Sequence, residues 1–174
     1  GGLIQTANAF KIDKQSFNYN SGRVVVSGLN VTLPNAVDSN SKLFITGHLT
    51  LGGQQDGDPG VAPRWEYSTD NSSWSVIQNT THITSGHAGS DANSNVGNSA
   101  GYDGWLNNED VKHASWSTMC SASDVSQARY YRVTVRQTDS SNHSVVVNSN
   151  YGGTASTGYA PSGNSSLVVM EIGV

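Results

Sequence analysis

The last ten residues, 165–174, form a nearly unbroken apolar run in a chain that is otherwise poor in such runs. A β-prone, nearly uncharged segment without proline would promote aggregation if it were a free tail. A strand in a half-solvated sheet shows one polar face, but here Glu171 is the only charged side chain on either face. The run therefore predicts a central strand, covered on one side by the domain core and on the other by a second layer or a neighbouring copy of the chain.

Packing against sister subunits is the interpretation that we favour, because a closed ring buries the same strand three times around one axis. We expect a homotrimer in which this strand forms the interface through Leu167, Val168, Val169, Met170, Glu171 and Ile172. Carboxylates close to an axis would repel one another without partners. We therefore predict that Glu171 pairs with Arg132 or Arg136, which share one face of the strand predicted over residues 129–138.

The composition indicates a folded domain without nucleic-acid partners. The 174 residues suit one domain, and only 35% are hydrophobic and 13% charged. Disordered chains are usually highly charged and poor in aromatic residues, whereas this chain has four Trp, seven Tyr and three Phe at a net charge of −4. The nine Lys and Arg residues are scattered, which argues against a nucleic-acid surface. No apolar stretch is long enough to predict insertion into a membrane.

The number of cysteines bears on the cellular compartment in which the chain folds and assembles. Cys120 is the only cysteine, so neither an intrachain disulfide nor a cysteine-based zinc site can form. The absence of disulfides favours assembly in a reducing cytoplasm. The chain starts at Gly1 without Met, which suggests a piece of a longer protein, with residues 1–20 as a linker from it.

The pattern along the chain predicts eight to ten strands and no amphipathic helix. Residues 129–138 alternate clearly, with Tyr131, Val133 and Val135 inward, and residues 42–51 alternate with a gap at Gly47. A hairpin is predicted between Trp65 and Trp74, and residues 124–127 allow one helical turn at most. We expect an all-β fold, an antiparallel jelly-roll β-sandwich.

The final run, closing a β domain rich in Ser, Asn and Gly, resembles the C-terminal ends of bacteriophage tail-fibre and related virion proteins, particularly those of marine and cyanobacterial phages. Residues 165–172 carry this resemblance, with weaker support from the hairpin over residues 65–74. Such tips often resemble the trimeric jelly roll of the tumour-necrosis-factor-like and complement-globular-head-like domains, in which the last strand packs near the threefold axis. No active-site motif comes with the resemblance.

Aromatic residues in polar segments are the candidate ligand contacts. Flat rings beside Asp and Asn side chains suit sugars, which present an apolar ring face and a rim of hydroxyls. The alternative is that these rings fold back to cover the ends of the sandwich. The candidates are Tyr102, Asp103, Trp105, Tyr151 and Tyr159.

Signals for metal binding and catalysis are weaker. Oxygen-rich turns at Asp56, Asp58 and Asp91 suggest a structural calcium ion, although each also reads as a plain loop. Residues 97–101 match the nucleophile-elbow pattern, but the flanking residues predict neither the strand nor the helix that an elbow needs. The five histidines show no pair at metal-ligand spacing. We therefore expect no catalytic residues.

These observations favour a non-enzymatic virion protein, assembled in the host cytoplasm. The predicted function is receptor binding at the tip of a phage tail fibre, with a host surface glycan or protein as partner. Two alternatives stay open: a carbohydrate-binding module of a secreted bacterial enzyme, and a carbohydrate-active hydrolase domain.

Overall fold

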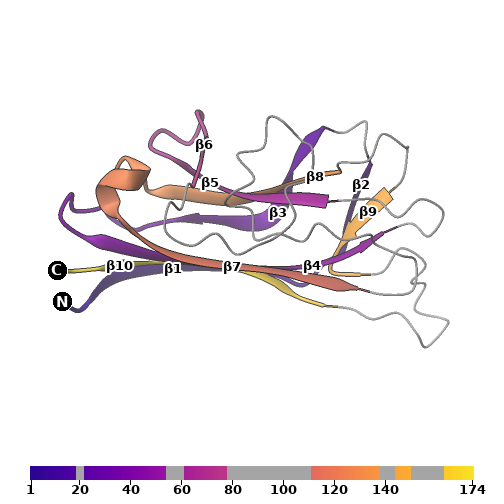
Figure 1. Cartoon of the computed structure of the whole chain (residues 1–174), viewed down its shortest axis with the longest axis horizontal. Coiled ribbons are helices and arrows are strands. Elements are labelled where there is room, and N and C mark those ends of the chain that lie inside the picture. Colours follow the sequence, from indigo (N-terminus) through magenta and orange to yellow (C-terminus); the bar gives the residue numbers. More distant parts are fainter. Residues whose placement is uncertain (19–21, 54–60, 78–110, 138–143, 150–162) are drawn as a thin grey trace.

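Two antiparallel sheets pack face to face in the computed structural model (Figure 1). The structure describes residues 1–18, 22–53, 61–77, 111–137, 144–149 and 163–174. Sheet A contains β1 (Leu3–Lys11), β2 (Gln15–Asn18), β4 (Lys42–Gly53), β7 (Lys112–Ser121), β9 (Ser144–Val147) and β10 (Ser165–Ile172). Sheet B contains β3 (Arg23–Thr32), β5 (Val61–Ser68), β6 (Ser75–Val76) and β8 (Tyr130–Gln137). A single 3₁₀ turn, η4 (Ala122–Val125), follows β7.

The strand pairing is that of a jelly roll. In sheet A the order is β1-β10-β4-β9-β2, with β7 also paired to β4, and in sheet B the order is β3-β8-β5-β6. The pairs are nested: β5 pairs with β6, β4 with β7, β3 with β8, and β1 with β10, all antiparallel. This nesting is the product of one long hairpin rolled into two facing sheets. The predicted all-β jelly-roll sandwich is confirmed.

The terminal run is the central strand that its composition predicts. β10 lies between β1 and β4 in sheet A, with Val169 opposite Ala7 on one side and Ile45 on the other. Leu167 and Val169 point between the sheets and are fully buried. Tyr131, Val133 and Val135 of β8 face them from sheet B, also fully buried, as the alternation of that strand predicts.

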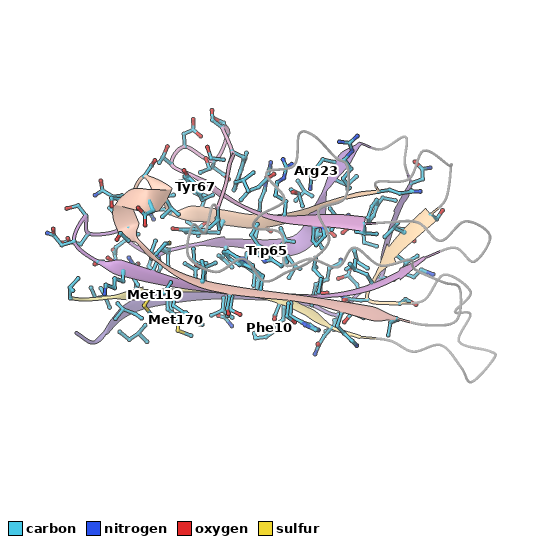
Figure 2. The ribbon with its side chains drawn as sticks, viewed as in Figure 1. Phe10, Arg23, Trp65, Tyr67, Met119 and Met170 are labelled. Atoms are coloured by element: carbon cyan, nitrogen blue, oxygen red, sulfur yellow. The ribbon has the colours of Figure 1, made fainter. Side chains whose placement is uncertain are left out.

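The gap at Gly47 is filled by a ring from the opposite sheet. A Cβ built on Gly47 would lie 1.9 Å from Nε1 of Trp65, so the indole occupies the space that a side chain would need. Trp65, which Figure 2 labels, also stacks on Trp116 of β7, and the ring centroids lie 5.5 Å apart. The absence of a side chain at Gly47 therefore allows the largest buried residue of the core to lie between the sheets.

Two further expectations can be compared with the structure. Residues 3–11 and 15–18, which are expected to belong to a linker, form β1 and β2 at opposite ends of the strand order of sheet A, so the linker prediction is wrong for them. The predicted hairpin is confirmed, because Glu66 lies opposite Val76 and Tyr67 opposite Ser75. Its turn is stabilised by Asp70, whose carboxylate accepts hydrogen bonds from the backbone N–H groups of Ser72 and Ser73, each at 2.8 Å.

The sandwich has two different ends. Both chain termini lie at one end, where the N–H of Gly173 donates to the carbonyl of Gly2 at 2.9 Å (Figure 1). At the other end β4 and β8 finish and β5, β7 and β10 begin, as their registers require. Within the described ranges, no helix is both long and apolar enough to span a bilayer.

Candidate functional site

The sequence-predicted contact residues all lie outside the described residues, but the strands that flank them are described. Residues 54–60 connect the end of β4 to the start of β5, and residues 150–162 lie between β9 and β10. Residues 78–110 follow β6, which ends opposite Glu66, and precede β7. Residues 54–60 and 150–162 join strands at the end of the sandwich opposite the termini, which we call the loop end, whereas residues 78–110 lead from β6, in the hairpin at the opposite end, to the start of β7 at the loop end. Asp56, Asp58, Asp91, Tyr102, Asp103, Trp105, Tyr151 and Tyr159 belong to these connections.

A buried asparagine ties the strands together at the loop end. Asn148 follows β9 in a left-handed conformation, φ 65°, which asparagine tolerates better than most residues. Its Nδ2 donates to the carbonyl of Lys11 at 2.8 Å, and its Oδ1 accepts from Oγ of Ser165 at 2.6 Å. Its backbone N–H donates to the carbonyl of Thr50 at 2.8 Å. This one residue, at the end of β9, therefore joins β1 and β10 through its side chain and β4 through its backbone.

A buried lysine braces the same end. Lys11 is 1% exposed, and its Nζ lies 2.7 Å from Oδ2 of Asp13 and 3.1 Å from Oγ of Ser27. The ammonium of Lys11 lowers the pKa of the Asp13 carboxyl by hydrogen bonding. Sequence reasoning missed both Asn148 and Lys11, because polar residues beside apolar ones are ordinarily expected to face solvent. For Asn148, the one local signal is an asparagine directly after a run of three valines, where a strand is expected to end in a turn.

Glu171 is buried as predicted, but its partner is not an arginine. It is 1% exposed, points between the sheets, and accepts hydrogen bonds from Nε2 of Gln5 and from the N–H of Asp38, the latter at 2.8 Å. Burial raises the pKa of Glu171, but hydrogen bonds from Gln5, Ser41 and Asp38 outweigh it and leave the pKa below its ordinary value. The predicted pairing with Arg132 or Arg136 is therefore wrong. Neutral donors on neighbouring segments stabilise this carboxylate instead.

The two arginines lie on the opposite side of the molecule. Because Val133 and Val135 face the core, Arg132 and Arg136 face outward from sheet B. Arg132 pairs with Glu66 through an Nε–Oε2 distance of 2.7 Å, and its guanidinium lies 4.0 Å from the ring centroid of Trp74. Alternation along the strand shows that Arg132 and Arg136 share a face. It does not show which side chains of other strands lie beside that face.

The residues predicted to form the subunit interface lie on two opposite faces of β10. Leu167, Val169 and Glu171 lie inside the sandwich of a single chain and cannot contact a neighbouring copy, which corrects half of the prediction. Val168, Met170 and Ile172 point away from sheet B and are half-buried. They belong to a surface that we call the outer face of sheet A, formed by Ile4, Thr6, Asn8, Phe10, Phe44, Thr46, His48, His113, Ser115, Ser117, Met119, Ser166, Val168, Met170 and Ile172.

A histidine pair lies on this outer face. The rings of His48 and His113 stack with centroids 5.2 Å apart, one from β4 and one from β7. His48 Nδ1 lies 2.9 Å from Oγ of Ser115, and His113 Nδ1 lies 3.3 Å from Oγ1 of Thr50. Burial, and secondarily the neighbouring His113, lower the pKa of His48. Sequence spacing could not reveal this pair, because strand pairing brings the two rings together.

The described residues offer little for metal binding or nucleophilic chemistry. No three His, Cys, Asp or Glu side chains gather there in a group that could hold a metal ion. Burial raises the pKa of the Cys120 thiol to about 11, so that this thiol stays protonated and unreactive at neutral pH.

Comparison with known proteins assigns the chain to no family. No family model matches it, and no curated protein matches it. Among solved structures it is similar to the VP2 subviral particle of infectious bursal disease virus, at 10% identity and a TM-score of 0.47, over 97% of this chain and 37% of that chain. The Gt strain of the same virus is similar at 11% identity and a TM-score of 0.47, over 99% and 38%. The chain spans little more than a third of the length of these proteins. Similarities this distant do not indicate its function, which has to be inferred from its own residues.

Proposed function

We propose that the chain is a non-catalytic attachment module of a virus particle, the tip of a phage tail fibre that binds a glycan or protein on the host surface. The observation that carries the proposal is the position of the candidate contacts in the sequence. Tyr151 and Tyr159 belong to a connection between strands that meet at the loop end, and Tyr102, Asp103 and Trp105 belong to the connection that enters β7 at that end. The termini lie at the other end of the sandwich, so that a parent fibre joined there would leave the loop end free to face a host.

The loop end has the rigidity that such a role requires. Binding loops are useful when a stiff scaffold sets their positions, because less conformational entropy is then lost on binding. Asn148 joins four strands at this end, and Lys11 with Ser27 links the two sheets there. These buried polar contacts support the proposal that the loop end is a platform for recognition.

The described carboxylates favour binding over hydrolysis. A glycosidase needs two carboxyl groups facing each other across a cleft. In the described ranges, Glu171 and Glu66 are the buried carboxylates, and both serve the scaffold: Glu171 with Gln5, and Glu66 with Arg132 and Thr134. For the hydrolase alternative, the two catalytic carboxyl groups would have to come from the connections between the strands.

Further parts of the proposal concern assembly and ions. We propose that the chain forms a homotrimer, is assembled in the host cytoplasm and acts in the virion. A calcium ion at Asp56, Asp58 or Asp91 would stiffen the connections but is not needed for binding. No nucleic acid and no membrane insertion are part of the proposal.

The test is binding without turnover. Trp105→Ala is expected to weaken binding to host cells or to a glycan array at least about tenfold while leaving thermal unfolding nearly unchanged. Trp74→Ala is the matched control, since Trp74 is a partly exposed indole in the hairpin at the opposite end. Equal losses for both variants, release of cleaved glycan, or a collapse of stability in Trp105→Ala would each contradict the proposal.

A further inference from the structure

We propose that the outer face of sheet A is the surface on which a second copy of this chain packs. The inference deepens the proposed function, on which it rests, by naming the surface through which the module assembles. Figure 2 shows Phe10, Met119 and Met170 on the side of sheet A turned away from sheet B, with Trp65 between the sheets. Four strands contribute to the surface: β1, β10, β4 and β7.

The first observation is that β1 turns its largest apolar side chains outward and its longest polar ones inward. Gln5 and Lys11 are buried on the inward side, beside the small Ala7 and Ala9, whereas Ile4 and Phe10 on the outward side are 57% and 65% exposed. A strand at the edge of a solvated sheet normally turns its apolar side chains inward and its polar ones outward. The reversal is explained if the outer face is itself covered in the assembled protein.

The second observation is the continuity of the apolar side chains across the sheet. The strand registers place Thr6, Met170, Phe44 and Met119 in one row across β1, β10, β4 and β7. Val168 and Ile172 flank this row on β10, and Met119 is 53% exposed. A contiguous apolar patch of this kind on an isolated chain marks an interaction site, and methionine side chains adapt readily to a partner surface.

The third observation identifies the partner by charge. When the histidines are neutral, the one charged group among the described side chains that point outward here is Lys42, which lies opposite Ile172 at the end of the face. A partner with a strongly basic or acidic surface would therefore find little counter-charge here. A second copy of the same nearly uncharged face meets little like-charge repulsion, although the whole chain carries a net charge of −4.

The size of the face is sufficient for a specific contact. Strands lie about 4.8 Å apart and rise about 3.4 Å per residue, so four strands over eight residues give a flat area on the order of 500 Å². Side-chain relief increases the accessible area beyond this value. Two such faces together reach roughly the 1,000 Å² that a specific interface needs.

The experiment compares one exposed apolar residue on each outer face. Met119→Glu places a charge in the outer face of sheet A, and Val25→Glu places the same charge on the outer face of sheet B, where Val25 is 40% exposed. Sedimentation velocity of the whole chain at micromolar concentration is expected to show an oligomer for the wild type and Val25→Glu. Met119→Glu is expected to weaken association at least about tenfold, since the charge would be desolvated in the contact.

A second measurement locates the contact. Ser117→Cys in a Cys120→Ser background is expected to form an intermolecular disulfide or short-linker cross-link between copies, because Ser117 lies on this face two residues from Met119. A monomeric wild type, equal association of Met119→Glu and Val25→Glu, or cross-linking through Val25→Cys instead would overturn the inference. Failure of the proposed function looks different: the oligomer would persist while host binding by the wild type is absent.

Discussion

The two outer faces of the sandwich belong to sheets of the same kind but have opposite chemistry. On sheet B, the charged groups are satisfied within the chain, as in the contact of Arg132 with Glu66 and Trp74. Four of the five arginines lie on this face, Arg23, Arg64, Arg132 and Arg136. On sheet A, the corresponding face carries apolar and uncharged side chains and includes Phe10 and Met119, which are more than half exposed. The fold itself does not require this difference, because either face could have been solvated.

The comparison separates stability from assembly. Changes between the sheets should destabilise the whole fold, changes on sheet B should alter stability alone, and changes on sheet A should alter association. The following predictions test that separation, beginning with the largest expected effect.

Gly47→Ala should be the most destabilising of these changes. Its Cβ would lie 1.9 Å from Trp65 Nε1, so the indole or the strand must move and both sheets lose their packing. We expect a loss of about 3 kcal/mol or more in the free energy of unfolding, measured by urea denaturation. Gly2→Ala is the control, because no atom lies within 4 Å of its Cβ. Similar midpoints for the two variants would show that Trp65 is not confined over Gly47.

Glu171→Ala should have the next largest effect, because it leaves the amide of Gln5 and the N–H of Asp38 without their buried acceptor. We expect a loss of about 2–3 kcal/mol in the free energy of unfolding, with a smaller loss for Glu171→Gln. A melting temperature that is unchanged in Glu171→Ala would contradict this role.

The same carboxylate makes a prediction about pH. Since the pKa of Glu171 is lowered in the fold, its contribution to stability is present above the ordinary pKa of 4.5 and is lost as pH falls through the folded value. Urea denaturation of the wild type should therefore show a falling midpoint below that pH. Glu171→Gln, which cannot titrate, should show a shallower decline.

Arg132→Ala should lower stability without changing association. It leaves the mostly buried carboxylate of Glu66 with Thr134 as its remaining described side-chain partner, and we expect a loss of about 1–2 kcal/mol. The sedimentation of this variant should match that of the wild type. Dissociation of the oligomer in Arg132→Ala would remove the distinction between the two faces.

The smallest effect is expected from the histidine pair. The pKa of His48 is lowered by burial and by the neighbouring His113, so this ring is neutral at neutral pH, and its protonation at acidic pH would place positive charge in the outer face of sheet A. Ser115 and Ser166 face His48 from the neighbouring strands, and neither is charged. We expect association to weaken a few-fold between pH 7 and pH 5, and less so in a double variant with His48→Gln and His113→Gln. Equal pH dependence in both proteins would assign the effect to other groups.

Much of the fold could be predicted because local patterns are strong in several strands. The alternation of Tyr131, Val133 and Val135 defines β8, and the turn chemistry around Asp70 defines the hairpin. β1 was missed for a physical reason, since its fully buried side chains, Gln5 and Lys11, are polar and its largest apolar ones are exposed. Apolar alternation therefore indicates no buried face in this segment.

The sequence by itself determined that the chain is an all-β sandwich with a central terminal strand, because alternation and turn residues act over a few neighbouring positions. It also indicated which residues of that strand share a face. Only the tertiary structure decided which face is internal, that Gln5 rather than an arginine meets Glu171, and that His48 stacks on His113. These contacts join residues far apart in the chain, and their formation depends on strand order and register, which no local pattern encodes.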